Sequence, residues 1–287
     1  HVDIGAASLV TLMAFLWAGN PIGIKLVLDV APPIRQAWMR LVLGGLTVLG
    51  RARVTGTPLR VYRHEVSRLL VLGALFTVQI GLMNLGIKYT SAAHVAILPT
   101  TSPIYTLLLA HLFVPGDRLT ARRATGILLA YAGVVLVFSH EFRLDSVYLL
   151  GDCITSGSAI LLGVRTVYLN RVVQRIDPMK LLLAQVIFSV PSYLAWSAVF
   201  EAGDPYRWSW GLALSLAYQG CVVAGFNFIL NLHLLKTYSP SGLASYYLAT
   251  PIFGVLQSWL IVGEAITPRL LVAAVMVAAG IALANRR

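Results

Sequence analysis

The sequence is poor in charged residues. Only 11 % of its 287 residues are Asp, Glu, Lys or Arg, whereas a soluble domain carries about 25 %. So few charges cannot cover a surface that faces water, and this excludes an ordinary soluble protein. Nearly uncharged segments of about 20 residues recur along the chain, which is the length that a helix needs to cross a bilayer. We therefore expect lipid to be the solvent for most of the surface.

Cysteine and metal-ligand patterns are scarce as well. Only Cys153 and Cys221 are present, both in apolar segments, so we expect buried free thiols and no disulfide. The chain has no phosphate-binding G-x-x-x-x-G-K-[ST] loop and no H-E-x-x-H zinc motif. These absences argue against a nucleotide-driven pump and a metalloenzyme. We predict no metal, no cofactor and no enzymatic activity.

Acidic residues are half as numerous as basic ones, 11 against 22. The basic residues fall mostly in short loops rather than in a basic and aromatic patch, so we expect no nucleic-acid partner. Placing the N-terminus in the cytoplasm brings most loop arginines and lysines to that side. We therefore expect both termini in the cytoplasm of a bacterial inner membrane. We also expect no cleavable signal peptide, because the first apolar run is too long and lacks a basic start.

Ten apolar segments follow one another. Lipid leaves no partner for unpaired backbone groups, so all are predicted to be helices. The expected fold is an all-α integral membrane protein with ten transmembrane helices. Their predicted ranges are 4–28, 33–50, 68–87, 91–113, 120–139, 147–170, 178–201, 208–235, 239–262 and 267–285.

The fourth and fifth segments occur twice in the sequence. A shift of 148 residues aligns Lys88 with Lys236 and Pro103 with Pro251, and a shift of 147 aligns Gly133 with Gly280. Each half then has five spans, an odd number, so the halves face opposite ways across the membrane. We predict two inverted five-helix repeats, 1–145 and 146–287. Secondary transporters have this architecture, with a substrate site near the midplane.

The ordered motifs resemble those of the drug/metabolite transporter superfamily, specifically its ten-helix EamA-type members, over nearly the whole chain. The resemblance is carried by Leu16–Pro21, Pro32-Pro33, Arg40-Leu41, Pro103, Gly116-Asp117, Thr120, Gly126 and Gly133, and by Pro251, Gly263-Glu264, Thr267 and Gly280. Within the superfamily, general likeness is greatest to YddG-type amino-acid exporters. The resemblance implies an inner-membrane exporter of amino acids and related small amphipathic molecules, with a central substrate cavity.

Polar residues inside spans are the candidate substrate contacts, because each is costly against lipid. Gln79 and Met83 lie on one face of the third segment, which Phe76 shares. Asn227, in the eighth segment with Tyr218, is the counterpart of Gln79 in the second half. These side chains bind substrate or, alternatively, only tie helices together through hydrogen bonds.

Prolines in the duplicated segments predict loosened helices. Such sites suit a hinge or a binding site, and the alternative is a static kink. The predicted hinge residues are Pro99, Pro103 and Pro251, and the predicted substrate contacts beside them are Thr101, Tyr105, Tyr246 and Tyr247. The tyrosines either stack on a substrate or pack the core.

Four further candidates lie in other spans. Trp17 is in mid-span, away from the interface where a belt tryptophan sits, and Asn20 follows it in the first segment. Arg165 lies well inside the sixth segment and Arg40 in the second. Either arginine pairs a substrate carboxylate or extends its charge to the interface.

The sequence therefore predicts a secondary transporter that exports amino acids by alternating access, acting as a monomer in the bilayer on a small-molecule substrate. The alternatives are a carrier for another metabolite class, such as nucleoside or sugar phosphates, and a receptor or channel without transport.

Overall fold

A computed structural model describes residues 2–89, 98–116, 119–138, 149–262 and 268–285, and in these ranges all regular structure is helical. The all-α prediction is therefore confirmed for the part of the chain that the structure describes. The helices are α1 (Ile4–Lys25), α2 (Pro33–Val54), α3 (Arg63–Tyr89), η1 (Leu98–Thr101), α5 (Ser102–Phe113), α6 (Ala121–Phe138), α7 (Leu149–Val172), α8 (Pro178–Phe200), α9 (Trp210–Ala217), η3 (Tyr218–Asn227), α10 (Phe228–Thr237), α11 (Pro240–Tyr247), α12 (Thr250–Val262) and α13 (Pro268–Asn285).

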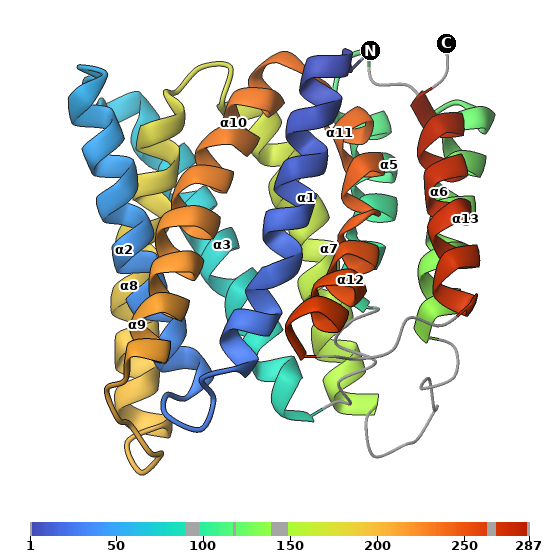
Figure 1. Ribbon diagram of the computed structural model, residues 1–287. Helices are drawn as coiled ribbons and strands as arrows, with labels where there is room; N and C mark the ends of the chain where they lie inside the picture. The colour runs from blue at the N-terminus through green and yellow to red at the C-terminus, as the bar shows by residue number, and fades with distance from the viewer. Residues whose placement is uncertain (1, 90–97, 117–118, 139–148, 263–267, 286–287) are drawn as a thin grey trace.

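The helices form a bundle whose neighbours are often far apart in sequence (Figure 1). Helix α2 packs on α8 and η3, α3 packs on α7 and α8, and α5 packs on α7. Helix α1 contacts α12, η3 and α11. Elements from the two predicted halves thus alternate through the bundle, and its centre is lined by both.

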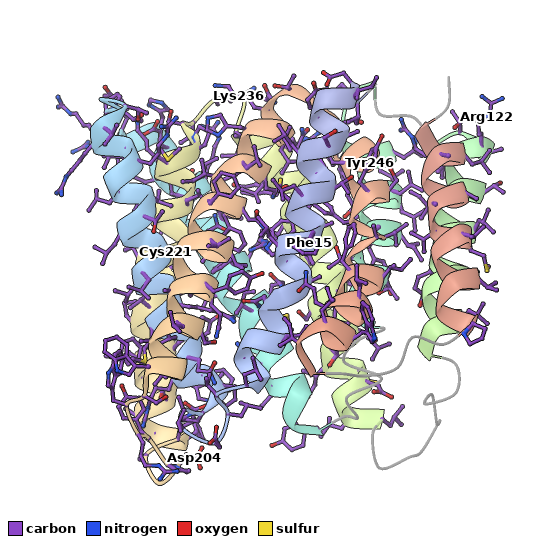
Figure 2. The ribbon with its side chains drawn as sticks, in the orientation of Figure 1. Phe15, Arg122, Asp204, Cys221, Lys236 and Tyr246 are labelled. Atoms are coloured by element: carbon purple, nitrogen blue, oxygen red, sulfur yellow. The ribbon has the colours of Figure 1, made fainter. Side chains whose placement is uncertain are left out.

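Four helical stretches are long and apolar enough to cross a membrane: Ile4–Ile24, Arg63–Gly86, Pro178–Phe200 and Trp210–Thr237. The start of α1 lies at the same end of the bundle as the end of α13 (Figure 1). Lys236 and Arg122 also lie at that end, and Asp204 lies at the opposite end (Figure 2).

The arginine-rich loop between α2 and α3 is shorter than predicted. Helix α2 continues to Val54, with Arg51 and Arg53 in its last turn, where positive charge favours the helix dipole. Helix α3 starts at Arg63, and the Glu65 carboxylate accepts a hydrogen bond from the Tyr62 backbone N–H at 2.9 Å.

The first helix is capped at its N-terminus by Asp3. Its carboxylate accepts a hydrogen bond from the Ala6 N–H at 2.8 Å and another from the Tyr238 hydroxyl. The bonds from Tyr238 and Ala6 hold the pKa of Asp3 below its usual value. Residue 238 follows α10, so this contact joins the first and second halves at one end of the bundle.

The eighth predicted segment is one helical rod that widens in its middle into the π-helix η3. Two glycines of η3 lie against α2: a Cβ at Gly220 would meet the Arg40 carbonyl, and a Cβ at Gly225 would meet Thr47. The absence of these side chains allows the two backbones to approach. Widened turns of this kind are frequent at functional sites.

Both proline-containing segments are interrupted at matching positions. Helix α5 begins at Ser102 after the 3₁₀ turn η1, and α12 begins at Thr250 after a break at Leu248–Ala249. Ser102 and Thr250 are 148 residues apart, which is the shift of the internal repeat. Pro103 and Pro251 therefore lie in the first turn of a helix, where the missing N–H costs nothing.

Helices α6 and α13 form a tightly packed pair at one edge of the bundle (Figure 1). A Cβ at Gly280 would collide with the backbone of Gly126 and Ala130, and one at Gly133 would lie 2.9 Å from the Ala273 carbonyl. The absence of side chains at these glycines lets the two backbones approach closely.

The cysteine prediction is half right. Both Cys153 and Cys221 are free thiols, but both are exposed on the outside of the bundle rather than buried. In a protein surrounded by lipid, an apolar segment shows apolar residues on its outer face as well as its inner one, so apolar context does not imply burial.

Candidate substrate site

A continuous row of aromatic rings crosses the centre of the bundle. Tyr247 of α11 contacts Trp17 of α1 at 5.2 Å between ring centroids. Trp17 contacts Phe228 of α10 at 6.0 Å, and Phe228 contacts Phe76 of α3 at 6.1 Å, each edge to face. We call Tyr247, Trp17, Phe228 and Phe76 the aromatic row. Contacts of this geometry contribute about 1 kcal/mol each beyond area burial.

Each end of the aromatic row carries a polar group. At one end the Tyr247 hydroxyl donates a hydrogen bond to the Asn231 Oδ1 at 2.7 Å. At the other, the Arg165 guanidinium of α7 lies 4.7 Å from the centroid of the Phe76 ring. An apolar stretch between two polar ends is the arrangement that an amphipathic solute requires.

Three side chains bond to carbonyls within one turn in the middle of α1. The Asn227 amide donates to the Met13 carbonyl at 3.1 Å, Gln257 donates to Phe15 at 2.7 Å, and the Tyr218 hydroxyl donates to Leu16. Gly19 leaves room for Tyr218 and Gln257 beside the helix. Phe15 marks this level of α1 in Figure 2. Tyr218 and Asn227 therefore position α1 rather than standing free.

Helices α3 and α7 meet along a polar seam. The Gln79 Nε2 donates to the Ser158 Oγ at 3.2 Å, and that hydroxyl donates to the Gln79 backbone carbonyl at 2.8 Å. Along the same contact, Arg165 lies over Phe76, which is one turn from Gln79 on α3. Gln79 is thus a tie between helices, as the alternative interpretation expected, and it also neighbours the aromatic row.

The two arginines inside spans bond to glutamines. Arg165 Nη1 donates to the Gln185 Oε1 of α8 at 3.4 Å, and Arg40 Nη1 donates to the Gln219 Oε1 of η3 at 3.4 Å. Arg165 is 9 % exposed and Arg40 is 7 % exposed. Both charges are therefore held among the helices, and neither extends to the interface.

Several buried polar atoms lack a hydrogen-bond partner within the described residues. Leaving such an atom unpaired costs about 1–3 kcal/mol. Some of them belong to predicted site residues, which is where ligand contacts are expected. The atoms are Asn20 Oδ1, Gln79 Oε1, Asn84 Nδ2, Thr155 Oγ1, Arg165 Nε and Asn227 Oδ1.

Other predicted residues lie beside the row rather than in it. The Thr101 hydroxyl donates to the Leu98 carbonyl at 2.6 Å within its own turn. Tyr105 lies against Gly163, where α5 approaches α7. Met83 is half-buried one turn beyond Gln79, and Tyr246 of α11 packs against the core near one end of the bundle (Figure 2).

Sequence reasoning missed several central residues. Phe228 joins the two parts of the row, and Gln185, Gln219 and Gln257 provide the amides that hold Arg165, Arg40 and α1. Each glutamine is a polar residue in an apolar span, a signal that would have selected it. A phenylalanine in such a span carries no signal of its own. Asp117 and Glu264, which belong to the motifs that carry the resemblance, lie outside the described residues.

A surface hollow of about 300 Å³ lies at the C-terminal end of α5, lined in part by His111, Phe113 and Arg171. No residue of the aromatic row lines this hollow. The row joins helices from both predicted repeats, and for that reason we take the row, and not this hollow, as the candidate site.

An all-helical bundle with apolar spans and polar side chains gathered inside is the arrangement of a multi-spanning membrane protein with a functional interior. The comparison with known families agrees. The chain belongs to the EamA-like transporter family, which matches residues 4–139 and 149–286. It is thus a membrane transporter of the drug/metabolite transporter superfamily.

Several relatives cover almost the whole chain. The "Uncharacterized transporter YoaV" of Bacillus subtilis is 20 % identical and covers 98 % of this chain and 95 % of its own. The "Probable amino-acid metabolite efflux pump" of Salmonella typhimurium is 24 % identical, covering 95 % of this chain and 92 % of its own. A crystal structure at 20 % identity covers 99 % of this chain and 98 % of its own with a TM-score of 0.85, so the fold is a known one.

Proposed function

We propose that the chain exports amino acids, chiefly aromatic or hydrophobic ones and related small amphipathic metabolites, across the bacterial inner membrane. The aromatic row carries this proposal, because it offers stacking surface between a guanidinium and a tyrosine–asparagine pair. The efflux pump of Salmonella typhimurium, named for amino-acid metabolites, lends support at 24 % identity.

The proposed mechanism is alternating access around the aromatic row. The row joins helices from both predicted repeats, 1–145 and 146–287, and two separate matches to the family support that division. In an inverted repeat of five plus five spans, rocking of one set of helices would open the row to either side in turn. The interruptions before α5 and α12 at matching positions are the proposed hinges, with Pro99, Pro103 and Pro251 beside them.

The proposed orientation has both termini in the cytoplasm. The start of α1 and the end of α13 lie at one end of the bundle, which also carries Lys236 and Arg122 (Figures 1 and 2). This arrangement agrees with the positive-inside rule. We propose that the protein acts as a monomer, without a cofactor and without enzymatic activity.

The test is counterflow of labelled phenylalanine in proteoliposomes. Wild-type protein should give saturable uptake that unlabelled phenylalanine on the inside stimulates. Trp17→Ala should lower this flux at least about tenfold, because an aromatic side chain that anchors a ligand contributes about 2 kcal/mol to its binding. Trp208→Ala, which removes an exposed tryptophan outside the helices, is the matched control and should transport normally.

Other outcomes would replace the proposal. Counterflow with sugar or nucleoside phosphates but not amino acids would assign another metabolite class. Conductance that does not saturate would indicate a channel, and solute binding without any flux would indicate a receptor.

A further inference from the structure

We propose that Arg165, assisted by the charge of Arg40, binds the carboxylate of the transported solute and selects carboxylates over amines of the same shape. This inference rests on the proposed transport function and adds the chemical group that the site recognises. It is carried by four features of the two arginines: their depth, their partners, a free edge of one guanidinium and the chemistry around it.

Both arginines lie well inside their helices. Arg40 is seven residues after the start of α2, and Arg165 is seven residues before the end of α7. At 1.5 Å per residue, each Cα is about 10 Å along the helix from its nearer end. The Arg165 side chain is held over Phe76 and bonded to Gln185, so it stays in the interior.

The partners of both arginines are neutral. Their hydrogen bonds go to the amide oxygens of Gln185 and Gln219, and no described carboxylate forms an ion pair with either. Two positive charges among apolar helices without a counter-ion are expensive to hold. A negative charge on the solute would offset that cost.

One edge of the Arg165 guanidinium has no partner among the described residues. Nη1 bonds Gln185, whereas the buried Nε has no partner within the described part of the chain. Nε and Nη2 form a planar pair of donors that matches the two oxygens of a carboxylate. This edge belongs to the group that ends the aromatic row, so a solute with a carboxylate beside a ring would satisfy both.

The surroundings disfavour a solute whose only charge is an ammonium. Among the described acidic residues, Asp3, Glu65, Asp177 and Glu201 lie at helix ends, Asp29 and Asp204 lie in connections between helices, and Asp152 lies in the first turn of α7. An amine would therefore meet two positive charges and no counter-ion from the described part of the chain. An amino acid differs, because its ammonium can bond the unpaired Gln79 Oε1, one turn from Phe76 on α3.

Three solutes with the same ring test the inference: phenylalanine, 3-phenylpropionate and phenethylamine. Each unlabelled solute competes with counterflow of labelled phenylalanine in proteoliposomes. In wild-type protein, both carboxylates should compete at concentrations at least about tenfold below phenethylamine, because charge-assisted hydrogen bonds between a guanidinium and a carboxylate are among the strongest in proteins. Equal competition by the amine and the carboxylates would overturn the inference.

Variants of Arg165 test whether this residue causes the preference for carboxylates. Arg165→Gln should abolish the preference for carboxylates, and Arg165→Lys should keep part of it, because the charge remains without the planar edge. Arg175→Gln removes an exposed arginine just after α7 and should keep the full preference. A full preference in Arg165→Gln would refute the assignment. If neither Arg165 variant folds, competition in wild-type protein decides.

A second readout separates this inference from the proposed function. Ligands that bind the folded state raise the melting temperature of the purified protein. If no solute is transported, the proposed function fails, yet a rise in melting temperature with 3-phenylpropionate and none with phenethylamine would still support the carboxylate site. If phenylalanine is transported but 3-phenylpropionate and phenethylamine raise the melting temperature equally, the proposed function is supported and the carboxylate site is refuted.

Discussion

Two buried cations of this protein have nearly equal exposure and very different partners. Lys180, in the first turn of α8, is 8 % exposed, and its Nζ lies 3.1 and 3.2 Å from the two carboxylate oxygens of Glu65. It also lies 5.0 Å from the Tyr62 ring. Arg165 is 9 % exposed. It contacts the Phe76 ring and the Gln185 amide, but no carboxylate among the described residues.

The difference separates a structural tie from a site that awaits a ligand. Lys180 and Glu65 join the first turns of α8 and α3 at one end of the bundle, and both charges are satisfied. Arg165 lies deeper, at the end of the aromatic row, with one donor unpaired. A buried charge that no described carboxylate neutralises is expected where a solute completes the site.

The largest expected effect comes from breaking the ion pair between Lys180 and Glu65. Glu65→Gln leaves the Lys180 ammonium buried without a counter-ion, which destabilises a protein by about 3 kcal/mol or more. The melting temperature of the purified protein should fall clearly below that of the wild type. The double variant Glu65→Gln/Lys180→Gln should recover most of the loss. If the single variant is as stable as the wild type, the pair is not a tie.

The second largest expected effect comes from giving Arg165 a carboxylate partner. Gln185→Glu places a carboxylate beside Arg165, in imitation of the Glu65–Lys180 pair. Phenylalanine counterflow should fall at least about tenfold, because the guanidinium is then occupied. The melting temperature should hold or rise, although the bond from Gln185 Nε2 to the Leu181 carbonyl, worth about 1 kcal/mol, is lost.

Gln174→Glu adds the same charge at an exposed position after α7 and is the control for this experiment. It should leave counterflow unchanged. Undiminished transport in Gln185→Glu would mean that the Arg165 charge takes no part in binding.

The smallest effect concerns Gln79. Gln79→Leu removes the unpaired Oε1 and the bond to Ser158, so stability should change by no more than about 1 kcal/mol. Phenylalanine should compete severalfold less well, since its ammonium loses an acceptor, whereas 3-phenylpropionate should compete as before. Equal weakening of both solutes would show that Gln79 acts only as a tie between α3 and α7.

Much of the helical framework is predictable from the sequence. Long uncharged segments require helices in lipid, and every described helix falls within or close to a predicted segment. The matching interruptions before Ser102 and Thr250 follow from the repeated prolines, although a kink was expected where the structure begins a new helix. The widened helix η3 was not predicted, because no proline or repeat marks it.

The partners of the candidate residues could not be predicted. A polar residue in a span shows that something must satisfy it, but the contact between α3 and α7 that sets Phe76 under Arg165 depends on how helices far apart in sequence pack. Trp17, Gln79, Arg165 and Tyr247 were selected as isolated residues. Phe228, whose ring lies between Trp17 and Phe76, resembles any other apolar residue of its span.

The most direct test of the central claim is the melting temperature of Arg165→Gln measured without solute. If the Arg165 charge is held at a cost for the sake of a ligand, its removal should leave the melting temperature unchanged or raise it, while Glu65→Gln lowers it. A fall in the melting temperature of Arg165→Gln comparable to that of Glu65→Gln would contradict the claim, since it would make Arg165 a structural residue like Lys180.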